Sequence, residues 1–226
     1  MFEWFKKQPL RGIDELKVSL SRDELIRKSR ILFIDDERPD LIEDLKKVRF
    51  SVDYESDITK DNIQLLEDPV HDLFIVDFAG VGGTLGKEQG LSILRHIKRV
   101  NPASVTMAYT SKSIRPEYSD FYLKADAVLQ KDAGIQESTE KIESALRLSY
   151  RVDRLWSGII QIADITSGSE QDRSLQDRFV RSLSTQTTSQ FKTEYAELCQ
   201  KVGASFGAIV IEKLIKVAVT TIAGSV

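Results

Sequence analysis

The sequence predicts an α/β fold: a doubly wound, five-stranded parallel sheet with an N-terminal helix before it and an all-helical C-terminal extension after it. Within residues 30–150, short apolar runs that suit buried strands alternate five times with segments of helical spacing. Strands that alternate with helices form a parallel sheet through right-handed crossovers. After residue 150 the strand pattern stops, while apolar residues still recur at helical spacing. We therefore predict an N-terminal helical segment at 1–29, a sheet domain at 30–150 and a helical output or assembly region at 151–226.

Each predicted strand is a short run of apolar residues, which is typical of strands buried on both faces of a sheet. These strands are expected at 31–34, 50–54, 73–76, 105–109 and 127–130. Between them, apolar residues recur every three or four positions and predict helices with one buried face. The helices are expected at 39–48, 61–67, 91–100, 118–124 and 136–149. Ahead of the first strand, the stretch from Ser21 to Glu24 has the spacing of a capping box, which indicates a helix start.

The helical region is expected to begin as a continuation of the helix at 136–149, because apolar residues at 155–163 extend its stripe. The small and turn-forming residues at 166–169 then predict a break. The Ser/Thr/Gln-rich stretch at 182–189 is interpreted as a linker. Beyond it, apolar residues spaced three or four apart at 191–209 predict a helix–helix seam.

Two apolar stretches near the C-terminus, 202–211 and 214–226, raise the question of a membrane span. Glu212 and Lys213 separate them, and a charge near the centre of a span costs roughly 2.5–3.5 kcal/mol. An amphipathic helix that self-associates therefore fits better than a spanning helix. The GxxxG pattern at 203–207 suits either core packing or a close contact with another helix or a membrane.

The composition argues against several classes of function. Of 226 residues, 41% are hydrophobic and 30% are charged, which supports a packed core rather than a disordered chain. The formal charge of −3 and the absence of a basic stripe argue against direct binding of nucleic acid. The single cysteine, Cys199, excludes a disulfide framework and a cysteine-based zinc site. The first 28 residues contain no continuous apolar secretory segment, so we expect a cytoplasmic protein.

Polar residues stand where the predicted strands end. Asp35 and Asp36 follow the first strand, Asp77 the third, Thr110 the fourth and Lys131 the fifth. The carboxyl ends of parallel strands share one edge of the sheet, so these side chains are expected to converge. Three close carboxylates need a cation to stay ionised, and oxygen ligands suit Mg²⁺. An aspartate beside Mg²⁺ can attack phosphorus, while an ammonium and a hydroxyl can hold the phosphoryl oxygens.

These five residues resemble the motif of the receiver domain of bacterial two-component response regulators, over about residues 29–150. Asp35 and Asp36 match the acidic pair, Asp77 the phosphoacceptor, Thr110 the hydroxyl residue and Lys131 the lysine of that family. Order and spacing also fit, with 41 residues from the acidic pair to the phosphoacceptor, 33 to the hydroxyl and 21 to the lysine. The resemblance implies that Asp77 accepts a phosphoryl group from a histidine kinase or a small phosphodonor, with Mg²⁺ held by the three aspartates.

The sequence departs from the family pattern in two loops. Asp77 is followed by a long glycine-rich segment, 78–86, in place of an early proline. Lys131 precedes Asp132, so the Lys-Pro pair and its cis-proline turn are missing. These departures leave the phosphorylation chemistry in place and put the usual relay of the signal in question.

The aromatic residue that receivers carry in the fifth strand is also missing. Val128 and Leu129 occupy that strand, and neither has an aromatic ring. Tyr109 or Tyr122 could substitute, and the sequence leaves both open.

Simpler interpretations exist for the same residues. Asp35 and Asp36 could cap the helix that starts near residue 39, because aspartate is a favoured N-cap, and Asp77 could be a turn residue. The Gly86-Lys87 pair invites a phosphate-loop interpretation. That loop requires glycine where Val81 stands and a hydroxyl residue where Glu88 stands, so a flexible loop fits better.

We therefore predict a phosphorylation-controlled signalling switch rather than a conventional enzyme, whose helical region mediates homo-oligomerisation or partner binding. The alternative is a phosphorylation-independent scaffold or effector subunit on the same fold, which acts through its C-terminal helices and could touch a membrane. A hydrolase of the haloacid-dehalogenase type is weaker, because the Asp-x-Asp pattern it requires is missing after the first strand.

Overall fold

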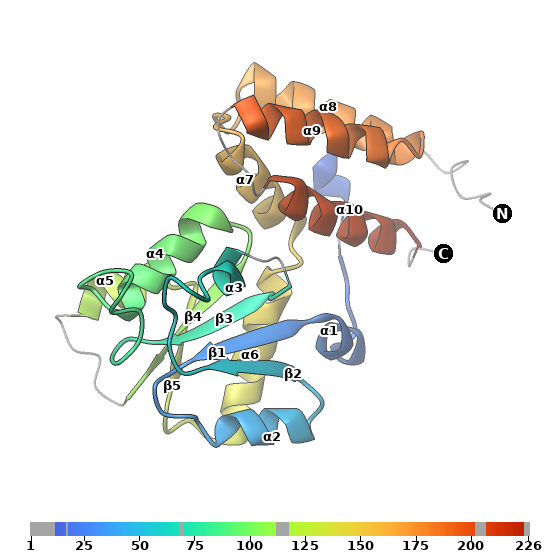
Figure 1. Ribbon diagram of the computed structural model, residues 1–226. Coiled ribbons are helices and arrows are strands. Elements are labelled where there is room, and N and C mark those ends of the chain that lie inside the picture. Colours follow the sequence, from blue (N-terminus) through green and yellow to red (C-terminus); the bar gives the residue numbers. More distant parts are fainter. Residues whose placement is uncertain (1–11, 17, 68–69, 112–117, 202–206, 224–226) are drawn as a thin grey trace. The chain divides into compact units, whose positions relative to one another are not determined.

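The computed structural model describes residues 12–16, 18–67, 70–111, 118–201 and 207–223 (Figure 1). Their contacts divide the chain into two compact units: a sheet unit, 20–149, and a helical unit that combines 150–226 with the segment before residue 20. The predicted segment 1–29 thus contributes described residues to both units. The predicted domain boundaries themselves stay a prediction.

The sheet unit contains five strands, all paired in parallel, as the pattern of buried apolar runs predicts. The strands are β1 (Arg30–Ile34), β2 (Ser51–Glu55), β3 (Leu73–Asp77), β4 (Val105–Thr110) and β5 (Ala127–Gln130). Their order is β2-β1-β3-β4-β5, which is the doubly wound order of flavodoxin-like and receiver folds. The predicted fold class is confirmed. Because strands are added on opposite sides of β1, the switch point lies between β1 and β3, where such folds bind their ligands.

The described residues of this unit form six helices, which cover both faces of the sheet. They are α1 (Arg22–Lys28), α2 (Leu41–Lys47), α3 (Gln64–Glu67), α4 (Gly90–Val100), α5 (Ser119–Lys124) and α6 (Ile135–Leu148). Helices α1 and α2 pack with α6 on one face, and α3 and α5 pack with α4 on the other (Figure 1). The predicted capping box starts α1: Ser21 N donates to Glu24 Oε2 (3.0 Å), and Glu24 N donates to Ser21 Oγ (3.3 Å).

The last helix of the sheet unit is shorter than predicted. The expected continuation of α6 into residues 155–163 is wrong, because α6 ends at Leu148 and a separate helix, α7 (Val152–Ile162), follows. At the break, the Ser149 hydroxyl donates to the Leu146 carbonyl (2.8 Å), and Arg151 adopts an extended backbone as the N-cap of α7. A serine side chain that takes up a helical carbonyl in this way competes with continuation of the helix.

The helical unit agrees with the predicted absence of strands after residue 150. Its described elements are the short 3-10 helix η2 (Ile13–Glu15), α7, α8 (Glu170–Ser184), α9 (Thr188–Lys201) and α10 (Gly207–Ala223). The predicted linker at 182–189 is wrong, since only three residues separate α8 from α9. The Thr185 hydroxyl donates to the Arg181 carbonyl (2.9 Å) and bonds to the Thr187 hydroxyl (2.8 Å), so the polar residues build a tight turn.

Two buried polar side chains of the helical unit, Asp172 and Tyr195, have hydrogen-bond partners. Asp172, which is 3% exposed, accepts hydrogen bonds from Trp156 Nε1 and Gly168 N (both 2.7 Å). Tyr195 donates its hydroxyl proton to the Ile159 carbonyl (2.7 Å), which joins α9 to α7. Cys199 is buried one helical turn further along α9.

Two predictions concern the C-terminal residues: the GxxxG pattern and the absence of a membrane-spanning helix. The predicted GxxxG pattern lies almost wholly outside the described residues, since 202–206 are not described. Among the helices that are described, none combines the length and apolar character needed to cross a membrane.

Candidate functional site

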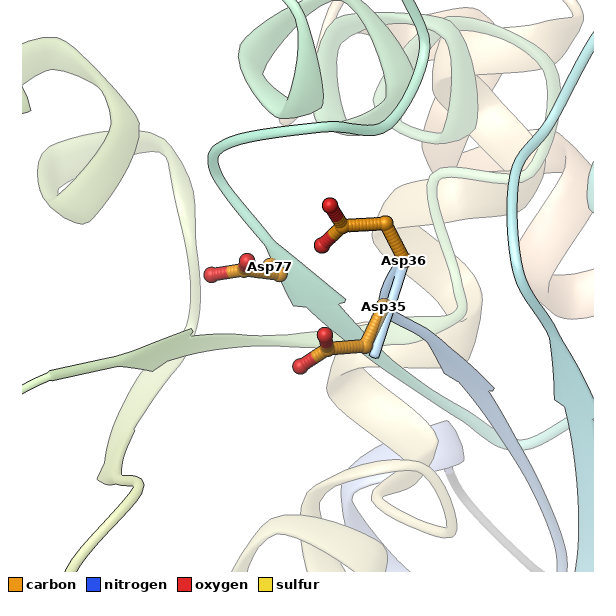
Figure 2. Close-up of side chains that lie close together, drawn as sticks. All are labelled: Asp35, Asp36 and Asp77. Carbon is orange, nitrogen blue, oxygen red and sulfur yellow. The ribbon is translucent and has the colours of Figure 1, made fainter. Parts of the chain in front are cut away.

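Three aspartates meet at the carboxyl edge of the sheet (Figure 2). Ile34 pairs in register with Val76, so Asp35, directly after β1, lies level with Asp77, the last residue of β3. One carboxylate oxygen from each of Asp35, Asp36 and Asp77 lies within 4.8 Å of the others. Asp35 is fully buried, Asp77 is 8% exposed, and Asp36 faces solvent. The structure thus brings together, at the topological switch point, the three residues that the sequence pattern selected.

Lys131 supplies the positive charge of this cluster. Its Nζ lies 2.8 Å from Asp35 Oδ2 and 3.1 Å from Asp77 Oδ2. The backbone holds it there, since Lys131 N donates to the Thr110 carbonyl (2.6 Å), and the peptide bond to Asp132 is trans. Burial lowers the pKa of Lys131, but its bonds to the two carboxylates outweigh burial and raise that pKa above its ordinary value. The ammonium is therefore charged at any physiological pH.

The surroundings of Asp77 shift the pKa of its carboxyl group. Burial raises the pKa of Asp77, the nearby charge of Asp35 adds to the rise, and Lys131 opposes it. The result is a pKa above the ordinary value of an aspartate. A carboxylate in this position gains stability from any additional cation beside it.

The donor set fits a hard divalent cation. Three carboxylates face one ammonium, so the cluster keeps an excess of negative charge, and its available ligand atoms are oxygens. Mg²⁺ prefers such oxygen ligands and fills its remaining positions with water or phosphate. Asp35, Asp36 and Asp77 are the residues that would hold it.

The simpler interpretation of the acidic pair does not fit. The N-cap residue of α2 is Asp40, not Asp35 or Asp36. Instead, Asp35 Oδ1 accepts the backbone amide of Glu37 (3.0 Å), which turns the chain directly after β1. This local bond leaves Asp35 Oδ2 directed to the cluster, where Lys131 contacts it.

Thr110 lies at the end of β4, one residue beyond the register partner of Asp77, and is 7% exposed. Its Oγ1 bonds to the Tyr122 hydroxyl (2.9 Å) and donates to the Ser111 carbonyl (3.1 Å). Because the Thr110 hydroxyl donates its proton to the Ser111 carbonyl, the hydrogen bond between Thr110 and Tyr122 is donated by the Tyr122 hydroxyl. The hydroxyl residue of the cluster is thus already engaged by a side chain of α5.

The two tyrosines that the sequence left open have different neighbours. Tyr122 touches Thr110, whereas Tyr109 packs edge-on against Phe33 (ring centroids 5.5 Å apart) and lies beside Lys131, whose Nζ is 5.2 Å from its ring. Sequence reasoning could place Tyr122 on a helix after the fourth strand. Only the rotation of α5 against the sheet brings its hydroxyl to the site.

The glycine-rich segment after Asp77 folds back over the cluster. Gly90 N donates to the Phe78 carbonyl (3.0 Å) and closes the segment, and the ring of Phe78 stacks on Tyr118 at 3.9 Å. Gly80 has φ +74° and lies directly against the carboxylate of Asp36. Sequence reasoning identified this segment only as a flexible loop.

Comparison with known proteins adds likenesses of fold. No protein-family model matches the chain, and no curated protein matches it. A CheY-like response regulator receiver domain protein from Methanospirillum hungatei JF-1 is 22% identical, with 54% of this chain and 95% of that one covered and a TM-score of 0.43. NtrX from Brucella abortus in complex with ADP is 20% identical, with 67% and 33% covered and a TM-score of 0.47. A streptococcal redox sensor evolved from two-component response regulators is 20% identical, with 53% and 51% covered and a TM-score of 0.44. The strand order of the sheet, rather than these likenesses, establishes the doubly wound fold that flavodoxin-like proteins and receivers share.

Proposed function

We propose that the chain is a phosphorylation-controlled signalling switch whose phosphoacceptor is Asp77. The observation that carries the proposal is the convergence of Asp77 with Asp35, Asp36 and Lys131 at the switch point of a receiver-type sheet. A carboxylate oxygen of Asp77 would form a bond to phosphorus of a histidine kinase's phosphohistidine or of a small phosphodonor. The bond between phosphorus and its donor breaks, and the electron pair leaves with the donor group.

Each neighbouring residue has a defined task in this transfer. Mg²⁺ bound by the three aspartates would offset the negative charge that an incoming phosphoryl group adds. Lys131, which contacts Asp77 before transfer, would pair with a phosphoryl oxygen afterwards. Thr110 would turn its hydroxyl proton from the Ser111 carbonyl to another phosphoryl oxygen. The helical unit would convert the added charge into a change of oligomeric state or of partner binding in the cytoplasm.

The test is the mass and oligomeric state of the purified protein after incubation with acetyl phosphate and Mg²⁺. We expect one added phosphoryl group per chain, and none in Asp77→Asn, which keeps the shape of the side chain and removes the nucleophile. Asp132→Asn, next to Lys131 in the chain, is the matched control and should be phosphorylated normally. An unmodified wild-type protein would instead favour the phosphorylation-independent scaffold, in which Lys131 already neutralises a resting site.

Tyr122→Phe tests the role of Thr110. Tyr122 donates to Thr110 Oγ1, and this bond can persist while Thr110 turns its own proton from Ser111 to the phosphoryl group, so removal of the Tyr122 hydroxyl takes away a bond that positions Thr110. A single hydrogen bond contributes about 0.5–1.5 kcal/mol, so beryllofluoride, which mimics the phosphoryl group, is expected to bind roughly two- to tenfold more weakly. Calorimetric titration in the presence of Mg²⁺ measures this change.

The control for this prediction is Thr110→Ala. In that background, Tyr122→Phe should leave beryllofluoride binding unchanged, because the hydroxyl that Tyr122 positions is already gone. An equal effect of Tyr122→Phe with and without the Thr110 hydroxyl would contradict the proposed positioning of Thr110 by Tyr122.

A further inference from the structure

Asp36 is the least confined member of the aspartate cluster. Asp35 and Asp77 are buried at strand ends, which restricts their rotamers, whereas Asp36 faces solvent in the turn after β1. An exposed aspartate side chain samples several staggered positions unless a neighbour blocks them. For Asp36 to point at the other two carboxylates, as it does in Figure 2, something outside its own strand must limit it.

The backbone of the glycine-rich loop is that neighbour. Gly80 adopts φ +74°, in the left-handed region that favours glycine, and a Cβ atom at this position would overlap all three atoms of the Asp36 carboxyl group. The Asp36 carboxylate therefore packs against the Cα atom of Gly80, in the space that a side chain at this position would fill. Gly83, three residues further along the same loop, has open space where its Cβ would be and an ordinary φ.

A second contact fixes the loop in this position. Gly82 N donates to Asp57 Oδ1 (2.5 Å), and Asp57 lies in the connection between β2 and α3. That connection is itself braced, since Asn62 Nδ2 donates to the Asp57 carbonyl (3.0 Å) and Asn62 Oδ1 accepts Thr59 N (2.7 Å). Asp57 thus ties the loop after Asp77 to a structured neighbouring segment.

We propose that Gly80 and Asp57 are positioning residues for the metal site: Asp57 holds the loop, and Gly80 holds the Asp36 carboxylate within reach of Asp35 and Asp77. The inference rests on the proposed function in that the three aspartates bind Mg²⁺. It also gives the glycine-rich loop a role, as the surface against which the exposed ligand is set.

The test is the Mg²⁺ dissociation constant of the full chain, measured by isothermal titration calorimetry, together with metal-free thermal unfolding. Loss of a residue that orients a metal ligand weakens binding by about 10–100-fold. We expect a loss in this range for Gly80→Ala, because the new methyl group displaces Asp36. Gly83→Ala is the matched control in the same loop and should bind Mg²⁺ as the wild type does.

A pair of substitutions at Asp57 tests the second half of the proposal without a new methyl group near Asp36. Asp57→Ala removes the acceptor of Gly82 N and should weaken Mg²⁺ binding by about tenfold, the lower end of the same range. Asp57→Asn keeps a carbonyl oxygen as the acceptor and should restore nearly wild-type affinity.

The outcomes separate this inference from the proposed function. If Gly80→Ala and Asp57→Ala lower the melting temperature of the metal-free protein but leave Mg²⁺ affinity unchanged, both residues are structural only and the inference is wrong. If the wild type itself binds no Mg²⁺, the inference and the metal part of the proposed function fall together.

Discussion

Replacement of Lys131 by methionine is expected to destabilise the metal-free protein by roughly 3 kcal/mol, the lower end of the cost of removing one partner from a buried ion pair. Lys131 is the cation in contact with both Asp35, which is fully buried, and Asp77. Methionine keeps an unbranched stem beside the ring of Tyr109 and removes the ammonium, with its charge and its hydrogen bonds to the two carboxylates. The lower end applies because a third of the lysine side chain is exposed. Urea unfolding in the presence of a chelator measures the loss.

Mg²⁺ should return much of the stability lost in Lys131→Met, since a divalent cation can take over the neutralisation of the two carboxylates. The control is Lys141→Met, which breaks an exposed pair with Glu137 and should cost no more than about 1 kcal/mol. Equal losses in the two variants would show that Lys131 is not the charge that stabilises the resting site.

A loss of stability is also expected in the helical unit for Asp172→Ala. The substitution leaves Trp156 Nε1 and Gly168 N without the acceptor that each now has at 2.7 Å. Trp156 is buried, whereas Gly168 is exposed and can turn to water, so one buried donor loses its partner, which costs about 1–3 kcal/mol. Tryptophan fluorescence during denaturant unfolding measures it. Asp177→Ala, an exposed aspartate on the same helix, should change stability by no more than about 0.5 kcal/mol.

The same carboxylate gives this stability a defined dependence on pH. Burial raises the pKa of Asp172, but hydrogen bonds from Gly168, Trp156 and Gln176 outweigh burial and hold that pKa below its ordinary value. The ionised Asp172 therefore contributes fully to the free energy of unfolding above the pKa of about 4 that an aspartate has in the unfolded chain. This contribution is lost as the pH falls through the lower pKa of Asp172 in the folded protein. The difference between the wild type and Asp172→Asn should be constant near neutral pH and shrink in acid. A difference that grew on acidification would contradict this account.

The sheet and its acidic edge could be predicted from the sequence because both depend on local signals. Buried parallel strands are short apolar runs, and residues directly after such runs must meet at one edge of the sheet. Asp35 and Lys131 directly follow a strand and Asp77 ends one, so their meeting requires only the topology.

Other contacts of the site could not be predicted, because they depend on how elements rotate and how loops fold. The Tyr122 hydroxyl reaches Thr110 only through the packing of α5 on the sheet. Gly80 meets Asp36 only because the loop turns back over the strand from which it came. The break between α6 and α7 could not be predicted for a related reason. The apolar residues recur with the same period on both sides of Ser149, so their spacing alone predicts one continuous helix.

The burial of Cys199 has a practical consequence. The chain contains one thiol, it is 1% exposed, and burial raises its pKa. A thiol reagent or cellular oxidant attacks the thiolate and must reach the sulfur, so reaction requires α9 to separate from its neighbours. When opening and closing are fast compared with the reaction, the rate of modification reports the population of opened molecules. The protein thus carries its own probe of how often the helical unit opens under native conditions, with no label added and no second cysteine to confuse the signal.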